Sequence, residues 1–158
     1  MARIYRGKGS TWLIAGAVLS LAAALLHVGV IIGGPDWYRF FGAPESYARA
    51  AARGSITPAL VTSGIAMGLA IWAAYATSGA GIIARLPLLR TGLIVITAVY
   101  LARGLLIVPT VILVPYSQGA FDYWSSIIVL IYGVVHAVGL TRAWPDLARR
   151  GSHSGPPS

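Results

Sequence analysis

The chain of 158 residues contains no cysteine and no asparagine. The lack of cysteine excludes disulfide bonds, thiolate zinc sites, iron–sulfur clusters and cysteine nucleophiles. The lack of asparagine excludes N-linked glycosylation. Charge is also scarce, since charged residues make up 10% of the chain, against about 25% in a typical soluble domain. Only four residues are acidic, and all four lie outside or at the edges of the apolar segments described next.

Four long apolar segments make up most of the chain, at residues 11–33, 57–78, 88–108 and 122–144. Each has about 20 residues, the length that an α-helix needs to cross ~30 Å of hydrocarbon. The segments are apolar all round, whereas a soluble helix needs only one apolar face. We therefore predict an all-α integral membrane protein, a four-transmembrane-helix bundle in one domain, 1–144. Residues 145–158 are expected to form a disordered cytoplasmic tail, and no soluble catalytic or nucleic-acid-binding domain is expected.

The basic residues predict the orientation of this bundle. Eight of them lie at the two ends of the chain and between the second and third segments: Arg3, Arg6, Lys8, Arg85, Arg90, Arg142, Arg149 and Arg150. The connection after the first segment has only Arg39, Arg49 and Arg53. The positive-inside rule then places both termini in the cytoplasm. A strong preference for arginine over lysine, with abundant alanine and glycine, indicates a bacterial inner membrane. The first segment is too long for the apolar core of a signal peptide and is expected to be retained.

Aromatic residues and the first connection predict how the bundle meets the membrane surface. Tryptophan and tyrosine prefer the headgroup level, and they occur near the segment ends, as at Trp12, Trp72, Tyr75 and Trp144. The first helix is expected to end at 33–35. A short outer interfacial helix over 44–53 follows from Pro44 at its start, Gly54 after its end and a Glu45–Arg49 pair. This helix would serve as an interfacial anchor or, alternatively, as a lid over an outward-facing site.

Three ionisable residues lie within the apolar segments: His27, Arg103 and His136. A charge in hydrocarbon is costly, and arginine stays protonated, so Arg103 needs an anion, carbonyl groups or water. We expect it to face the bundle interior near His27, within reach of a carboxylate or several carbonyls. The candidate ligand-binding residues are Arg103, His27, Tyr100, Asp36 and Asp122. Arg103 would either lock the bundle or bind an anionic small molecule or lipid headgroup.

The fourth segment carries a polar stripe. Ser125, Tyr132 and His136 lie within about 40° of one another at 100° per residue, on one helical face with Asp122. This stripe would be a hydrated path in a small transporter, or it would supply ordinary hydrogen bonds between helices. A haem held by His27 and His136 is a third possibility, but the two residues differ in expected depth by ~10 Å. No metal or other cofactor is expected.

No catalytic motif occurs in the chain, such as HExxH, GxSxG or a glycine-rich phosphate loop. The layout is similar to that of DoxX-like proteins and small multidrug exporters, although exporters use a glutamate in the first helix, where this chain has His27. We therefore expect a non-enzymatic binding or accessory protein. A small transporter and a haem-binding redox protein are the alternatives. The expected partners are the lipid bilayer and either further copies of the chain or a larger membrane complex.

Overall fold

The computed structural model describes residues 9–113 and 119–149, and these are almost entirely helical. The helices are α1 (Ser10–Phe40), α2 (Glu45–Ala52), α3 (Thr57–Gly79), α4 (Leu89–Leu105), α5 (Ile107–Leu113) and α6 (Ala120–Arg149). Four stretches are long and apolar enough to cross a membrane: Ser10–Phe40, Thr57–Gly79, Leu89–Thr110 and Ala120–Leu147. The predicted all-α fold with four spans is therefore confirmed.

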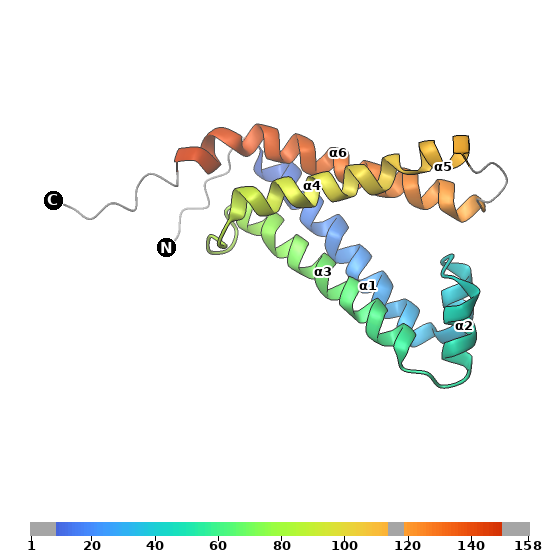
Figure 1. The fold of residues 1–158 in the computed structure, drawn as a ribbon. Coiled ribbons are helices and arrows are strands. Elements are labelled where there is room, and N and C mark those ends of the chain that lie inside the picture. The colour runs from blue at the N-terminus through green and yellow to red at the C-terminus, as the bar shows by residue number, and fades with distance from the viewer. Residues whose placement is uncertain (1–8, 114–118, 150–158) are drawn as a thin grey trace.

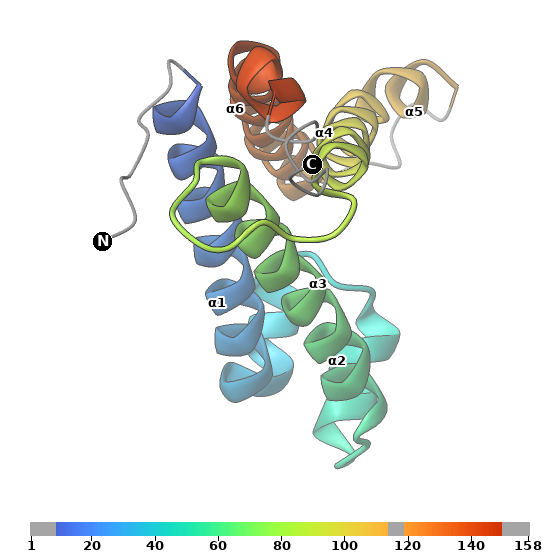
Figure 2. The same ribbon diagram turned by 90° about the vertical axis from the view of Figure 1, so that its left-hand side faces the viewer.

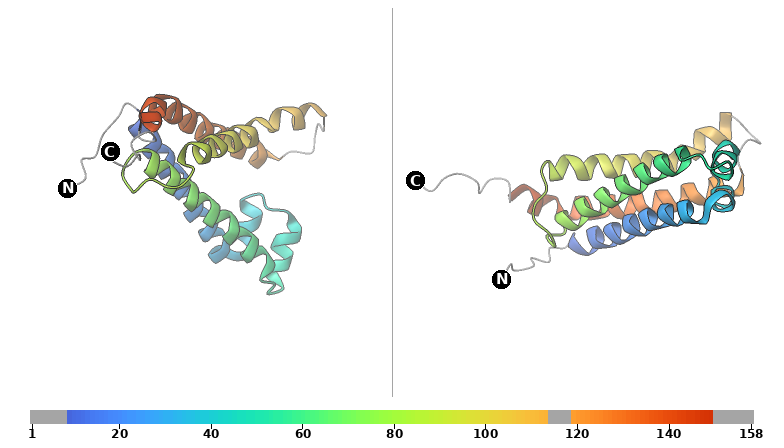
Figure 3. Two further views of the ribbon diagram at one scale, coloured as in Figure 1. Left: turned by 60° about the vertical axis from the view of Figure 1, so that its left-hand side comes forward. Right: turned by 90° about the horizontal axis from the view of Figure 1, so that it is seen from below.

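The four long helices form two arms (Figure 1). In the first arm α1 packs along α3, and in the second arm α4 packs along α6. The arms meet at the end where α3 leads into α4, and they diverge toward the other end, as Figures 1 and 3 show. We call these the joined end and the open end. Figure 2, which views the molecule from the joined end, shows α1 and α3 beneath α4 and α6.

Small residues allow the arms to approach each other at the joined end. A Cβ atom at Gly9 would lie 2.4 Å from the backbone nitrogen of Ala143, and one at Gly139 would lie 2.9 Å from Leu13 Cδ2. Glycine removes this obstacle, so α1 and α6 can pack closely in a lipid environment. A buried apolar cluster completes the joined end: Leu13, Ala80, Leu89, Leu93, Ala143 and Leu147.

Ser78 makes two hydrogen bonds to the connection between α3 and α4. Ser78 Oγ donates a hydrogen bond to the carbonyl of Ala84 and accepts one from the amide of Leu86, each at 3.0 Å. Leu88 then takes a left-handed conformation with φ of 51° immediately before α4, and no side chain caps the first turn of that helix. Ser78 and the conformation of Leu88 thus contribute to the positions of the loop and of the start of α4.

A helical hairpin, residues 35–52, projects from the open end of the first arm toward the second (Figure 1). The prediction that the first helix ends at 33–35 is only half right, because Gly34 breaks the helix with φ of 69° and helical geometry then resumes to Phe40. Pro35 fits this restart, since proline suits the first turn of a helix. The predicted short helix over 44–53 corresponds to α2. Its Ala48 is fully buried against Val30 and Tyr38 of α1.

The other predicted spans also differ from the structure at their ends. A turn at Leu106 separates α4 from α5, so the third span is broken near the open end. The fourth helix continues through Pro145 to Arg149, beyond the predicted end at 144. The first residues of the predicted tail are therefore helical, and residues 150–158 lie outside the described part of the chain.

Candidate functional site

A polar and aromatic cluster lies where the two arms begin to diverge. Tyr100 of α4 is at its centre and only 4% exposed. Its hydroxyl forms a 2.9 Å hydrogen bond with Ser20 Oγ of α1, which is fully buried. The Tyr100 ring also meets Trp72 of α3 edge-on at 4.9 Å, and Tyr132 and His136 of α6 at 5.7 and 5.1 Å. Tyr100 therefore contacts all three other spanning helices.

His136 is the most enclosed ionisable residue among those the structure describes, with 0% exposure. Its Nδ1 lies 2.8 Å from the Tyr132 carbonyl one turn earlier. Because a carbonyl only accepts hydrogen bonds, Nδ1 carries the proton and Nε2 remains an acceptor. Among the described residues Nε2 has no hydrogen-bond partner, and a Cβ at Gly16 would lie only 3.0 Å from it. The packing of α1 against this ring thus depends on glycine at position 16.

The polar stripe on α6 stops at His136. Beyond His136, toward the joined end, Gly139 packs against Leu13 and Ala143 packs against Gly9. Leu147 and Leu93 belong to the apolar cluster at the same end. The described residues therefore form an apolar seal between His136 and the joined end, and the stripe does not continue across the bundle.

Between this cluster and the open end, the side of α3 that faces the second arm is partly exposed. Ile65 lies seven residues before Trp72, on the same face of α3, and is 48% exposed. A Cβ added at Gly68, one turn before Trp72, would meet nothing within 4 Å. We call the sides of the arms that face each other the inner faces of the arms. At these two positions of α3 the inner face is apolar and only partly covered.

Arg103 lies on the inner side of the second arm, three residues beyond Tyr100 and within the span Leu89–Thr110. Its Nη1 donates a 3.2 Å hydrogen bond to Ser126 Oγ of α6, a hydroxyl that is 1% exposed. The side chain is otherwise exposed. Both ion pairs found among the described residues belong to Arg39, so no carboxylate neutralises Arg103 there. Its observed partner is a neutral hydroxyl in place of the expected carboxylate or carbonyls.

His27 is not brought into contact with Arg103. It lies seven residues beyond Ser20 on the same side of α1, so it is on the first arm past the point of divergence. Its Nδ1 donates to the Ala23 carbonyl at 2.7 Å, and its side chain is half-buried. The two residues lie on separate arms, whereas the prediction placed them together because of their similar depth in the membrane.

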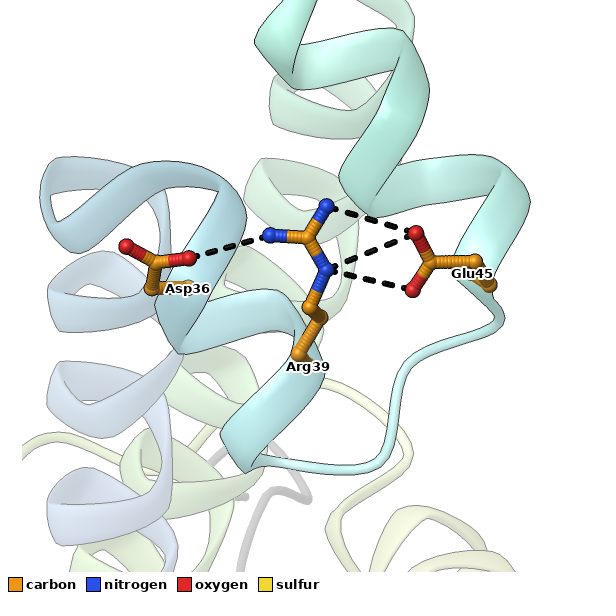
Figure 4. Close-up of polar contacts among 3 residues, drawn as sticks. All are labelled: Asp36, Arg39 and Glu45. Atoms are coloured by element: carbon orange, nitrogen blue, oxygen red, sulfur yellow. Dashed lines mark hydrogen bonds and ion pairs between the residues drawn. The ribbon is translucent and has the colours of Figure 1, made fainter.

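The two candidate carboxylates, Asp36 and Asp122, have local partners. Asp36 Oδ1 accepts a 3.0 Å hydrogen bond from Arg39, and Arg39 Nε lies 3.2 Å from Glu45 Oε2 (Figure 4). Glu45 therefore pairs with Arg39 and not with the predicted Arg49. Asp122 Oδ2 accepts a 2.9 Å hydrogen bond from the Gly119 amide, which caps the start of α6. Neither carboxylate joins a site with Arg103.

The open end of the molecule is bridged by the hairpin. A Cβ at Gly42, in the turn between α1 and α2, would overlap the Phe121 ring at the start of α6. Gly42 also has φ of 69°, a conformation that glycine adopts without strain. The hairpin and the two arms therefore form three sides of a triangle (Figure 1), and Arg103 and His27 lie on opposite arms of it. This contact gives the hypothesis of a lid a physical basis.

The arrangement does not fit a haem held by both histidines. Nε2 of His136 is packed against Gly16, so it is not open to an axial position on iron. Nδ1 of His27 bonds the Ala23 carbonyl and Nδ1 of His136 bonds the Tyr132 carbonyl, so each ring is held by its own helix. Within residues 9–113 and 119–149, no group of three or more His, Cys, Asp or Glu side chains could hold a metal ion.

Three contributors to this region escaped the sequence reasoning: Ser20, Trp72 and Ser126. Trp72 was taken as a marker of the membrane surface, yet its ring packs on Tyr100 inside the bundle. Ser20 and Tyr100 each lie about three turns from the joined end of their helices, and this equal depth was the available signal. Ser126 adjoins the predicted stripe residue Ser125, but it is Ser126 that faces α4.

Comparison of the chain with protein-family models, with curated proteins and with solved structures finds no match. The function therefore has to be argued from the arrangement of its own residues.

Proposed function

We propose that the chain is a non-enzymatic binding protein of the bacterial inner membrane that holds an anionic amphiphile between its arms. The observation that carries this proposal is Arg103, a cation within a membrane span whose only described hydrogen-bond partner is a neutral hydroxyl. An arginine at such a depth needs compensation, and an anionic headgroup supplies it. Bidentate hydrogen bonding to a phosphate or carboxylate suits the guanidinium fork.

The surroundings of Arg103 favour an amphiphile over a free anion. The inner faces present exposed apolar side chains such as Ile65 at 48%, and these suit an acyl chain. His27, on the opposite arm, adds a second polar group on the open side of Tyr100. The hairpin, in contact with Phe121 through Gly42, would then act as a lid at the open end.

A small transporter remains the second candidate function, and the stripe from Ser125 to His136 is the observation that favours it. A transport path has to reach both membrane faces. The apolar packing of Leu13 against Gly139 blocks the stripe at the joined end. Transport would therefore require the arms to separate there, whereas binding requires no such movement.

The test is native mass spectrometry of the protein purified from membranes in mild detergent. We expect an anionic lipid or small molecule to co-purify with the natural chain and to be lost from Arg103→Gln. Arg49→Gln, which removes an exposed charge from α2, is the matched control and should retain the ligand. If Arg103 only locks the bundle, Arg103→Gln will melt at a lower temperature while retention stays proportional to folded protein. That outcome would overturn the proposal.

A further inference from the structure

A second basic region lies at the joined end, at the opposite end of α4 from Arg103. We call it the arginine patch, and it consists of Arg85, Arg90 and Arg142. The Arg90 guanidinium lies 5.2 Å from the centre of the Trp144 ring, and that of Arg142 lies 5.5 Å from the Trp12 ring. Arg85 Nη2 donates a 3.3 Å hydrogen bond to the Leu147 carbonyl. Arg85 and Arg90 therefore both lie against the last turns of α6.

The positive charge of the patch is not balanced within the described chain. Asp146 is the one carboxylate nearby in sequence, and neither ion pair among the described residues involves it. Three arginines and one aspartate leave a formal charge of +2. In addition, Nε of Arg90 is buried and has no hydrogen-bond partner in residues 9–113 and 119–149. A guanidinium has five N–H donors, and the contacts above use few of them.

A pocket lies beside Arg85, between the α3–α4 loop and the end of α6. Its volume is about 90 Å³, several times what one water molecule requires, and its walls are Ser78, Gly81, Ile83, Arg85, Leu89 and Leu147. The first turn of α4 begins at the same place, without a side-chain cap. The backbone amides of such a turn carry partial positive charge and add to the attraction for an anion.

The apolar neighbours of the patch indicate that the anion belongs to a lipid. Leu88, Ile82 and Ile83 of the same loop are exposed to 78%, 49% and 44%. Trp12 and Trp144, which stack with two of the arginines, are residues that prefer the membrane–water interface. A lipid can place its phosphate against the arginines while its glycerol and acyl chains cover these apolar side chains, whereas a soluble anion cannot.

We propose that the arginine patch binds the phosphate of an anionic phospholipid, with Arg85 and Arg90 as the principal contacts. The site is separate from Arg103 and does not depend on the function proposed for it. It anchors the joined end, where α3, α4 and α6 meet, to the leaflet on that side.

The experiment titrates phosphatidylglycerol into purified protein in mixed micelles and counts bound lipids by native mass spectrometry, with phosphatidylcholine as the neutral competitor. It is run in the Arg103→Gln background, so that lipid held at the other site does not contribute. We expect R85Q/R90Q to weaken phosphatidylglycerol binding roughly thirtyfold, since each of the two arginines near an anionic surface contributes about 1 kcal/mol. R49Q/R53Q removes the same charge from the other end and should leave the affinity unchanged.

Equal affinity of R85Q/R90Q and the parent protein would overturn the proposal, as would an equal loss in R49Q/R53Q. Displacement of phosphatidylglycerol by millimolar inorganic phosphate would show a site for a soluble anion and would also overturn it. Should R85Q/R90Q fail to fold, R85K/R90K keeps the charge but loses the guanidinium fork. The lysine pair must then bind phosphatidylglycerol measurably more weakly than the parent protein, and unchanged affinity again contradicts the proposal.

Discussion

Single side chains at the point of divergence determine how the arms are joined. Tyr100 is the main example, because its hydroxyl bonds Ser20 and its ring contacts Trp72, Tyr132 and His136. A hydrogen bond between membrane helices contributes on average only ~0.6 kcal/mol. Leaving a buried hydroxyl without a partner costs about 1–3 kcal/mol. The loss of one partner should therefore be more damaging than the loss of both.

This asymmetry gives the first prediction. Tyr100→Phe keeps the ring contacts but strands the fully buried Ser20 hydroxyl, so it should lower the melting temperature in detergent. Adding Ser20→Ala removes the stranded group and should restore part of the loss. Tyr123→Phe, at an exposed tyrosine of α6, is the control and should melt like the natural protein. A simple sum of the two single effects in the double variant would contradict the hydrogen bond.

Gly16 provides the second prediction at this scale. A Cβ here would lie 2.8 Å from Cε1 of the buried His136 ring, so Gly16→Ala should destabilise the protein by about 1–3 kcal/mol through overpacking. Gly68→Ala places the same methyl group where nothing lies within 4 Å and should change stability by less than about 1 kcal/mol. Thermal unfolding of both variants in the same detergent measures the difference. If both melted alike, the described packing of α1 on His136 would be incorrect.

The sequence identified most residues of the site but not their neighbours. Arg103, His27 and His136 were found because ionisable groups are conspicuous in apolar segments. Their contacts depend on how far the arms diverge, and helical periodicity within one segment carries no information about the angle between two arms. For this reason Arg103 was matched with His27, whereas the structure gives it Ser126.

At the scale of elements, the hairpin over residues 35–52 connects the two arms at the open end. Its turn meets the second arm through Gly42 and Phe121, and it leaves α1 at the sharp break of Gly34. The break separates the long part of α1 from its last turns, residues 35–40. Rotation of the hairpin about Gly34 would expose the inner faces to the membrane surface, and this is the movement required of a lid.

The third prediction concerns this lid. Phe121→Ala removes the ring against Gly42, so it should speed the exchange of a bound amphiphile while changing the melting temperature little, because Phe121 is 38% exposed. Phe40→Ala is the matched control, since Phe40 is 77% exposed and packs on Phe41 of the hairpin itself. Exchange is followed by the release of a labelled anionic lipid over time. Unchanged release in Phe121→Ala would favour an anchor without a gating role.

Local rules predicted the existence of α2 well and its contacts poorly. Pro44 before α2 and Gly54 after it are residue types that mark the ends of a helix, and the structure has Pro44 at the N-cap and Gly54 with a positive φ. The Glu45 partner was misassigned because i,i+4 spacing suggested Arg49, while the fold brings Arg39 of α1 closer. Likewise, Gly34 and Pro35 predicted an end to α1, but proline in a first turn also permits a helix to restart.

On the scale of the whole molecule, hydropathy predicted the fold class but not the arrangement of the four helices in two diverging arms. Four apolar stretches require four helices, because a helix satisfies its own backbone hydrogen bonds in hydrocarbon. The number of spans is even, and Gly9 packs against Ala143, so α1 begins where α6 ends. The arms diverge from the point where close packing between them stops. The sequence of a single segment does not predict that point, because it depends on contacts between segments.

The fourth prediction is the orientation. The joined end carries the arginine patch, and the positive-inside rule places this end in the cytoplasm. A reporter fused after residue 158 should be active only as a cytoplasmic reporter. A fusion within the turn at Gly42 should give activity only in the periplasm. Activity with the opposite distribution would invert the orientation and place the hairpin in the cytoplasm.

The most direct test of the central claim is a melting curve with a defined anionic amphiphile. In the R85Q/R90Q background, which removes the two principal contacts of the arginine patch, dodecyl phosphate should raise the melting temperature of the protein, because a ligand that binds only the folded state stabilises it. The uncharged dodecanol should have no such effect. In the same background Arg103→Gln should abolish the rise. An equal rise with and without Arg103, or an equal rise with dodecanol, would contradict an anion held at Arg103.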